Sequence, residues 1–203
     1  MSAIESVTLE VPDPPAAEAF YAAAFGELAP VGVRAAEAPS TGFRGFTMSL
    51  VVAQPSTVDS LVGAALDAGA RSLKPVAKSF WGYGGAVQAP DGTVWTVASS
   101  PKKDTGPATR EIEEIVLLLG VADVKASKRF DVDRGLVVKR SFGGKYAEFD
   151  TGPKVKLALN KRHALAKNAD VSPDGTGSHR VIIGSDAGPF TDPDGFAWEA
   201  ASV

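Results

Sequence analysis

Few side chains in this sequence of 203 residues can act as nucleophiles or as metal ligands. The chain has no cysteine and only two histidines, His163 and His179. Without cysteine there is no disulfide, no thiolate nucleophile and no cysteine-ligated zinc. Two histidines without a Gly-x-Ser-x-Gly motif make a serine hydrolase a poor prediction, and no glycine-rich phosphate loop joins a strand to a helix. This composition therefore favours a pocket that binds a small molecule over a site for nucleophilic catalysis.

Large apolar side chains cluster in the inner part of the first half of the chain. They are Phe46, Met48, Trp81 and Tyr83, and the glycines at 82, 84 and 85 would let a ligand approach the backbone closely. This group predicts a pocket for a flat apolar or amphipathic molecule. The alternative is that most of these side chains pack in the core, where large aromatic residues usually lie.

The composition is that of an ordinary globular protein. Lysine and arginine total 21 against 24 aspartates and glutamates, and the net charge is −3. No dense basic block is present, so nucleic acid is not an expected partner. Apolar runs such as 115–119 are far too short to span a membrane. The first residues, MSAIESVTLEV, lack the features of a secretory signal, so we expect a cytoplasmic protein with no membrane partner.

The sequence contains an internal repeat. APDGTVWTVASS at 89–100 and DPDGFAWEAASV at 192–203 share Pro, Asp, Gly, Trp, Ala and Ser at an offset of 103 residues. A second correspondence pairs Asp13 with Asp123 and Phe20 with Phe130. A repeat close to half the chain length predicts two related domains.

We place the two predicted domains at 1–100 and 112–203, with a polar linker at 101–111. The second domain is shorter than the first. Only seven residues separate Gly184 from the turn that begins at Asp192. The second domain is therefore expected to lack one helix.

The same order of elements is expected at the start of each half. Apolar residues alternate with polar ones over 7–11, which predicts a half-buried strand. Asp13 is expected to cap the helix that follows, and Gly26 to end it. Ser56 and Asp59 resemble the start of a second helix. Further strands and a Pro-Asp-Gly hairpin complete the half.

The combination of these segments is more specific than any one of them. It comprises an apolar strand leading through an aspartate into a helix, a second helix ending in Ala-Gly-Ala, a Trp-Gly-Tyr-Gly-Gly segment and a closing Pro-Asp-Gly…Trp hairpin. This combination resembles the vicinal oxygen chelate superfamily, which includes glyoxalase I, bleomycin-resistance proteins and extradiol dioxygenases. The matching segments are 7–26, 58–70, 81–85, 90–95, 121–130 and 192–199.

The resemblance implies an α+β fold built from tandem βαβββ modules, whose curved mixed sheets enclose a cavity. The chain would consist of two related glyoxalase-like halves, the second lacking one helix. Metal enzymes and metal-free drug-binding proteins share this arrangement, so the fold does not by itself decide the function.

The resemblance also implies where a metal would lie. Enzymes of the superfamily hold a divalent metal with side chains on the opening strand of a module and with a glutamate after the closing turn. The opening positions here are Ser6 and Val116, and the closing positions are Thr96 and Glu199. His179 matches a further ligand position. A catalytic metal usually needs about three protein ligands, so His179 and Glu199 form an incomplete set.

The surroundings of these two residues can also be predicted. Glu199 alternates with Trp198, so it faces the cavity if the tryptophan packs beneath a helix. A carboxylate in that position requires a partner, for which Arg180 or His179 is expected. His179 could instead be an ordinary surface histidine.

Three functional hypotheses follow. The first is a protein similar to the bleomycin-resistance branch, which binds a small aromatic or amphipathic molecule without a complete metal site and without a cofactor. The second is a glyoxalase- or dioxygenase-type enzyme whose zinc, nickel, iron or manganese is held by His179, Glu199 and an unidentified ligand. The third is a scaffold that acts through protein contacts. Whether the protein is an enzyme stays open.

The first two hypotheses share a small-molecule ligand or substrate as the partner. A monomer and a homodimer are both compatible with the repeat. The residues predicted to contact the ligand are Phe46, Met48, Trp81, Tyr83, Ser6 and Thr96.

Overall fold

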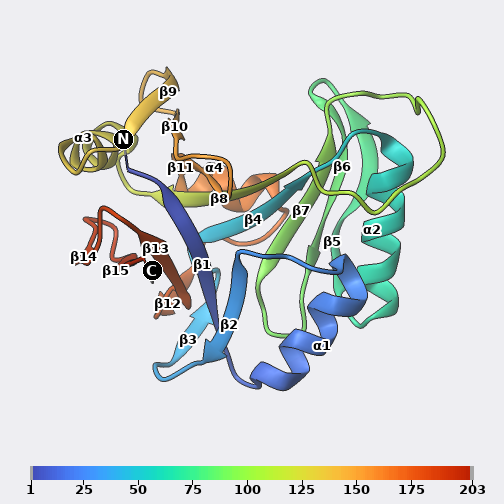
Figure 1. The fold of residues 1–203 in the computed structure, drawn as a ribbon, viewed down its shortest axis with the longest axis horizontal. Coiled ribbons are helices and arrows are strands. Elements are labelled where there is room, and N and C mark those ends of the chain that lie inside the picture. The colour runs from blue at the N-terminus through green and yellow to red at the C-terminus, as the bar shows by residue number, and fades with distance from the viewer. Residues whose placement is uncertain (1, 202–203) are drawn as a thin grey trace.

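Helices and strands follow one another in a similar order in the two halves of the chain (Figure 1). A computed structural model describes residues 2–201. The first half contains β1 (Ile4–Val11), α1 (Pro14–Phe25), β2 (Val31–Ala35), β3 (Ser40–Gly42), β4 (Phe46–Val51), α2 (Pro55–Asp67), β5 (Arg71–Ser79), β6 (Gly82–Gln88) and β7 (Val94–Ser99). The second half contains β8 (Glu114–Val121), α3 (Val124–Asp133), β9 (Val137–Phe142), β10 (Tyr146–Asp150), β11 (Lys156–Lys161), α4 (Arg162–Asn168), β12 (Gly175–Gly177), β13 (Val181–Ser185), β14 (Phe190–Thr191) and β15 (Ala197–Ala200).

Both large sheets combine strands from the two halves. The eight-stranded sheet has the order β5-β6-β7-β4-β8-β11-β10-β9, and the five-stranded sheet has the order β14-β15-β13-β1-β2. The halves join where β4 pairs with β8 and where β1 pairs with β13, both antiparallel. The linker at 101–111 thus separates the two copies of the sequence repeat. Each large sheet, however, contains strands from both sides of the linker. The α+β fold with curved mixed sheets is as the sequence predicted.

The start and end of α1 follow the sequence prediction. Asp13 caps the helix, because its carboxylate accepts a hydrogen bond of 3.0 Å from the backbone N–H of Ala16. Gly26 follows the last helical residue with a φ of 78°, a conformation that favours glycine. The correspondence of Asp13 with Asp123 is also confirmed, since Asp123 caps α3 in the same way.

The predicted capping of α2 was wrong. The helix begins at Pro55, and the side chains of Ser56 and Asp59 do not cap it. The Ser56 N–H instead donates to Asp104 of the linker at 2.8 Å. Asp59 accepts a hydrogen bond of 2.7 Å from the Tyr83 hydroxyl. A residue distant in sequence therefore replaces the local capping box.

The eight-stranded sheet has two chemically different faces. Met48, Leu50, Trp95 and Val97 point to one face and are completely buried beneath α1 and α2 in the main core. The five-stranded sheet contributes its own inward side chains to the same core. The alternate residues of these strands point to the opposite face, which we call the Thr96 face after its central residue.

The second half lacks a counterpart of α2, as the sequence predicted. β13 pairs in parallel with β15 and antiparallel with β1, as β4 does with β7 and β8. In the described chain α2 follows β4, whereas no helix lies between β13 and β14. The seven-residue α4 lies earlier, after β11, and its Leu165 and Ala166 contact Phe43 and Leu118 on the Thr96 face. α4 therefore covers the middle of the face opposite to the one on which α2 packs.

Candidate functional site

The topology brings two of the four implied metal positions together on the Thr96 face. Ser49 of β4 pairs with Thr96 of β7 on one side and with Val116 of β8 on the other. The three side chains form one row across the sheet. Hydroxyl groups are weak ligands for transition metals, which prefer imidazole, thiolate or carboxylate groups, and an aliphatic side chain has no atom that can bind a metal. The row suits a neutral or amphipathic ligand better than a metal ion.

The other two implied positions meet on the five-stranded sheet. Ser6 of β1 pairs with Gly184 of β13, and Gly184 pairs with Glu199 of β15. Each sheet thus combines one opening position with the closing position of the other half. Glu199 is the sole carboxylate among these four positions.

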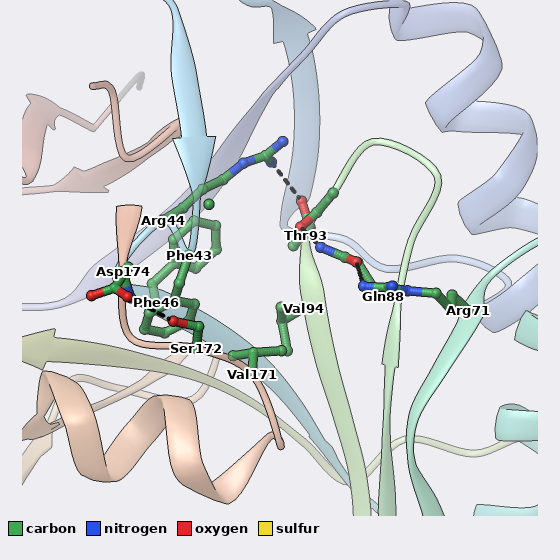
Figure 2. Close-up of a pocket in the computed structure, with 12 residues that line it drawn as sticks. Phe43, Arg44, Phe46, Arg71, Gln88, Thr93, Val94, Val171, Ser172 and Asp174 are labelled. Atoms are coloured by element: carbon green, nitrogen blue, oxygen red, sulfur yellow. Dashed lines mark hydrogen bonds between the residues drawn. The ribbon is translucent and has the colours of Figure 1, made fainter. Parts of the chain in front are cut away.

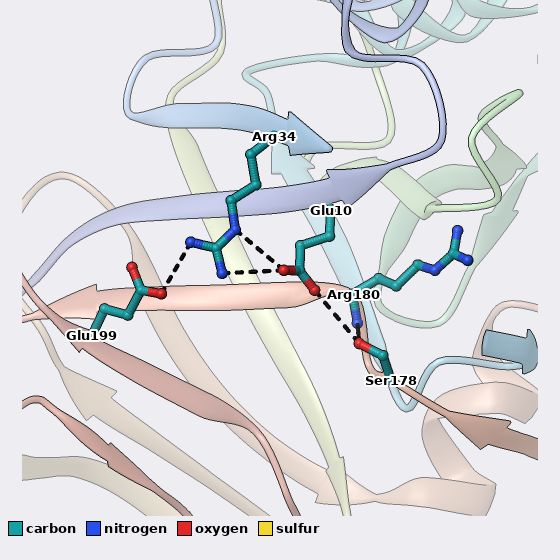
Figure 3. Close-up of polar contacts among 5 residues, drawn as sticks. All are labelled: Glu10, Arg34, Ser178, Arg180 and Glu199. Atoms are coloured by element: carbon teal, nitrogen blue, oxygen red, sulfur yellow. Dashed lines mark hydrogen bonds and ion pairs between the residues drawn. The ribbon is translucent and has the colours of Figure 1, made fainter. Parts of the chain in front are cut away.

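Arg34 of β2 provides the partner of Glu199 (Figure 3). Its Nη1 lies 3.0 Å from Glu199 Oε1, and its Nη2 lies 3.1 Å from Glu10 Oε1. Burial by itself lowers the pKa of Arg34, but the hydrogen bonds to Glu199 and Glu10 outweigh that effect and raise it. The structure therefore corrects the expectation that Arg180 or His179 is the partner.

His179 is held by main-chain oxygens and lies apart from the Arg34 ion pairs. Its Nδ1 is 2.5 Å from the carbonyl oxygen of Arg44, and its Nε2 is 3.0 Å from that of Asp194. The ring stacks on Phe196 with 4.0 Å between centroids. Each nitrogen faces a carbonyl oxygen, and the tautomer decides which of the two accepts its N–H. The residue thus joins two loops. Within residues 2–201, no group of three or more His, Cys, Asp or Glu side chains is arranged to hold a metal ion.

Trp81, Tyr83 and Thr96, three of the predicted ligand-binding residues, line one pocket of about 240 Å³. This Trp81 pocket is formed by residues 74–85 of β5 and β6, residues 96–99 of β7 and Asn168 at the end of α4. Tyr83 lies at its border, because its hydroxyl is directed to Asp59 of α2. That hydrogen bond raises the pKa of Tyr83, with a smaller contribution from burial.

The glycines beside Trp81 have a packing role that the sequence did not suggest. A Cβ atom on Gly84 would lie 2.7 Å from the Val97 carbonyl oxygen, and one on Gly85 would lie 2.9 Å from that of Lys74. Real Cβ atoms are almost never this close to another atom. The close neighbours of these glycines are the adjacent strands, so glycine is required here by the sheet itself.

The other three predicted ligand-binding residues lie elsewhere. Met48 is completely buried in the core, as the packing alternative predicted. Ser6 belongs to the five-stranded sheet. Phe46 is 2% exposed and borders a second pocket at the other end of the Thr96 face.

This second pocket, which we call the Arg44 pocket, has a volume of about 280 Å³ (Figure 2). It is lined by residues 42–44 and 92–94 together with Phe46, Arg71, Gln88, Val171, Ser172 and Asp174. Sequence reasoning missed it, because its residues come from four separate segments. The only local signal is an arginine beside two phenylalanines at 43–46.

The chain after α4 separates the two pockets. Ala169 packs against Ala86 and Val94 in the middle of the Thr96 face. Asn168 on one side of it lines the Trp81 pocket, and Val171 on the other side lines the Arg44 pocket. The face therefore offers two small sites in place of one open cavity.

Comparison with solved structures identifies the fold. Glyoxalase I from Zea mays superimposes with a TM-score of 0.62 and 16% sequence identity, over 98% of this chain and 91% of that one. A putative dioxygenase from Bacillus subtilis superimposes with a TM-score of 0.54 and 11% identity, over 89% and 69%. The protein thus shares the fold of glyoxalase I and of this putative dioxygenase, which is the fold that its motifs predicted.

At such low identity the likeness concerns the fold and carries no activity with it. Comparisons with protein-family models and with curated protein sequences return no match. None of the helices in the described part of the chain is both long and apolar enough to cross a bilayer.

Proposed function

We propose that the protein binds a small aromatic or amphipathic molecule in the Trp81 pocket, without a metal ion. The observation that carries this proposal is the row of Thr96, Ser49 and Val116. In the superfamily this face carries metal ligands, whereas here it ends in a pocket beside an exposed tryptophan. Such a site favours binding through contact with a flat ring.

The pocket has the features expected of a ligand site. Binding sites for small molecules combine apolar surface with a few polar groups that fix the orientation. Ala98 and Gly84 are among its apolar lining residues, while Thr96, Lys74 and Asn168 bring hydrogen-bonding groups. Its volume of about 240 Å³ lies below the usual range of 300–1,000 Å³. A single-ring ligand is therefore the best fit.

Calorimetric titration with 4-methylphenol tests the proposal, with 4-methylcyclohexanol as the non-planar control. We expect the planar compound to bind in the presence of a chelator. Trp81→Ala should weaken binding about tenfold, because an aromatic contact contributes about 1 kcal/mol beyond its buried area. Phe142→Ala is the matched control, since Phe142 is an exposed aromatic at the corresponding β9–β10 hairpin.

Intrinsic fluorescence gives an independent readout. Trp81 is 85% exposed, whereas Trp95 and Trp198 are buried. Acrylamide quenching of the native protein thus reports mainly on Trp81, and 4-methylphenol should reduce it. Stoichiometric divalent metal in the purified protein, together with loss of binding in chelator, would favour the metal-enzyme hypothesis instead.

A further inference from the structure

The Arg44 pocket contains two guanidinium groups and no carboxylate paired with either. From this arrangement we propose that the pocket is a second binding site, which takes a small organic carboxylate with an apolar body. The proposal does not depend on the ligand of the Trp81 pocket. It rests on the walls of the pocket and on the charges that they carry.

Arg44 and Arg71 are each held by hydrogen bonds to the segment 88–93, along one rim of the pocket (Figure 2). Arg71 Nη2 donates to Gln88 Oε1 at 2.7 Å, and Gln88 Nε2 donates to the Gly92 carbonyl oxygen at 3.1 Å. Arg44 donates to the Thr93 hydroxyl and to the carbonyl oxygen of Asp91. The rim is thus a connected set of donors whose positions are fixed by β5, β6 and the turn before β7.

The charge of Arg44 is poorly compensated. Burial lowers its pKa, and the nearby charge of Arg180 lowers it further, while Asp91 opposes both effects. The two hydrogen-bond acceptors of its guanidinium are uncharged oxygens, and no ion pair includes Arg44 among residues 2–201. A bound anion would stabilise this cation.

The guanidinium of Arg71 has N–H groups that can still donate hydrogen bonds to a ligand. A guanidinium carries five N–H groups in a planar fork that matches a carboxylate. Among residues 2–201 one of them has a protein partner, the side-chain amide oxygen of Gln88. Arg71 is exposed at the mouth of the pocket, so its free donors can reach a ligand without disturbing the sheet.

The other residues that line the pocket indicate the size, polarity and charge of the rest of the ligand. Phe43, Phe46, Val94 and Val171 provide apolar surface. Asp174 on the opposite side carries a negative charge, and its carboxylate accepts a hydrogen bond from Ser172. Like charges repel, so Asp174 disfavours a dianion such as a phosphate monoester. A monocarboxylate with a small apolar body matches both walls.

Titration calorimetry with three compounds that share a phenyl ring tests the site. Phenylacetate carries one negative charge, 2-phenylethanol carries none, and phenyl phosphate carries between about −1.5 and −2 at pH 7. We expect phenylacetate to bind about tenfold more tightly than the alcohol, since a charge-assisted hydrogen bond is worth about 1.5 kcal/mol or more. It should also bind more tightly than phenyl phosphate.

Two substitutions locate the binding. Arg71→Gln should weaken phenylacetate binding about tenfold and leave the alcohol unaffected. Arg129→Gln on the exposed surface of α3 is the matched control and should change neither. Because Arg71 is exposed and contacts a single side chain, its variant is expected to fold normally.

Three results would overturn the inference. The alcohol could bind as tightly as phenylacetate, phenyl phosphate could bind more tightly than either, or Arg71→Gln could leave phenylacetate binding unchanged. If Trp81→Ala abolished phenylacetate binding and Arg71→Gln did not, the ligand would belong to the Trp81 pocket. In that case the proposed function would stand and the second site would not.

Discussion

The guanidinium of Arg34 lies between the carboxylates of Glu199 and Glu10 on the five-stranded sheet. Glu199 belongs to β15, at the end of the second half, and Arg34 to β2 of the first half. Glu199 occupies the position at which the superfamily resemblance implies a metal ligand. In this protein a side-chain cation supplies the positive charge beside it.

Glu199→Gln is expected to have little effect on stability. The side chains of Glu199 and Arg34 are 54% and 43% exposed, and exposed ion pairs typically contribute between about 0.2 and 1 kcal/mol. Urea denaturation at neutral pH should therefore show a loss below about 1 kcal/mol. Glu10→Gln should cost about 2 kcal/mol, because Glu10 is 13% exposed and accepts hydrogen bonds from both Arg34 and Ser178.

The same two variants test the metal-enzyme hypothesis. If Glu199 were a metal ligand, Glu199→Gln would remove bound metal and lower thermal stability more than Glu10→Gln. The ion-pair network predicts the reverse order of stability, with an unchanged metal content for both variants.

His179→Ala is expected to destabilise the protein by about 2 kcal/mol. The imidazole holds the carbonyl oxygens of Arg44 and Asp194 and stacks on Phe196. Depending on its tautomer, the ring donates to one of these two carbonyl oxygens, so the substitution removes a hydrogen bond of about 1 kcal/mol together with the ring contact and leaves a cavity beside Phe196. Thermal and urea unfolding of the variant measure the loss.

His163→Ala is the control for that measurement. His163 is exposed on α4, and surface substitutions usually change stability by less than about 0.5 kcal/mol. Equal small effects in both variants would mean that His179 is not a structural bridge. Ligand binding in the Trp81 pocket should be retained in both.

The sequence correctly predicted the ends of helices that are set by residues close to one another in the chain. Asp13 and Gly26 bound α1 through contacts within one turn, so their types reveal their roles. The start of α2 was mispredicted because its partner, Asp104, lies 48 residues away. The sequence also did not predict that the two halves share sheets, since the pairing of β4 with β8 depends on the whole fold.

The site shows the same division between local and distant signals. Trp81 lies in the turn before β6, Tyr83 lies in β6 and Thr96 lies in the adjacent β7, so three of the six predicted ligand-binding residues line one pocket. Arg34 and the Arg44 pocket depend on strand order and on the path of residues 169–174, for which no residue pattern gives a signal. Gly84 and Gly85 line the Trp81 pocket, but their close contacts with β5 and β7 could not be read from the sequence.

The repeat also places Asp131 where the first half has Tyr21, eight residues after the capping aspartate. The Tyr21 hydroxyl donates to Asp91 of its Pro-Asp-Gly turn at 2.6 Å. Asp131 is 3% exposed. Burial first, then the charges of Asp192 and Asp194, raise its pKa to about 8, with Arg134 acting in the opposite direction. The second half thus buries a protonated acid where the first buries a phenol.

Asp131→Asn should therefore change the dependence of stability on pH. In the unfolded chain an aspartate ionises near pH 4, whereas Asp131 in the folded state stays protonated up to about pH 8. Between these values the native state binds more protons, so stability falls as pH rises, by up to about 1.4 kcal/mol per unit. Above about pH 8 the effect is constant.

Urea denaturation at pH 5, 6, 7 and 8 measures this slope. The asparagine variant should lose most of it and exceed the parent protein in stability at pH 8. The raised pKa of Asp192 leaves a residual slope of the same sign in both proteins. Parallel curves for the two proteins would show that Asp131 ionises normally in the folded state.

Leu165→Ala tests whether α4 is a fixed part of the Thr96 face. Leu165 is 2% exposed and packs with Phe43 and Leu118, and truncation of a buried leucine costs about 2–5 kcal/mol. Leu66→Ala on α2 is the control, since Leu66 is 39% exposed and should lose far less. A loss for Leu165→Ala below about 1 kcal/mol, with rapid amide exchange in α4, would mean that the helix opens readily and that the two pockets merge in solution.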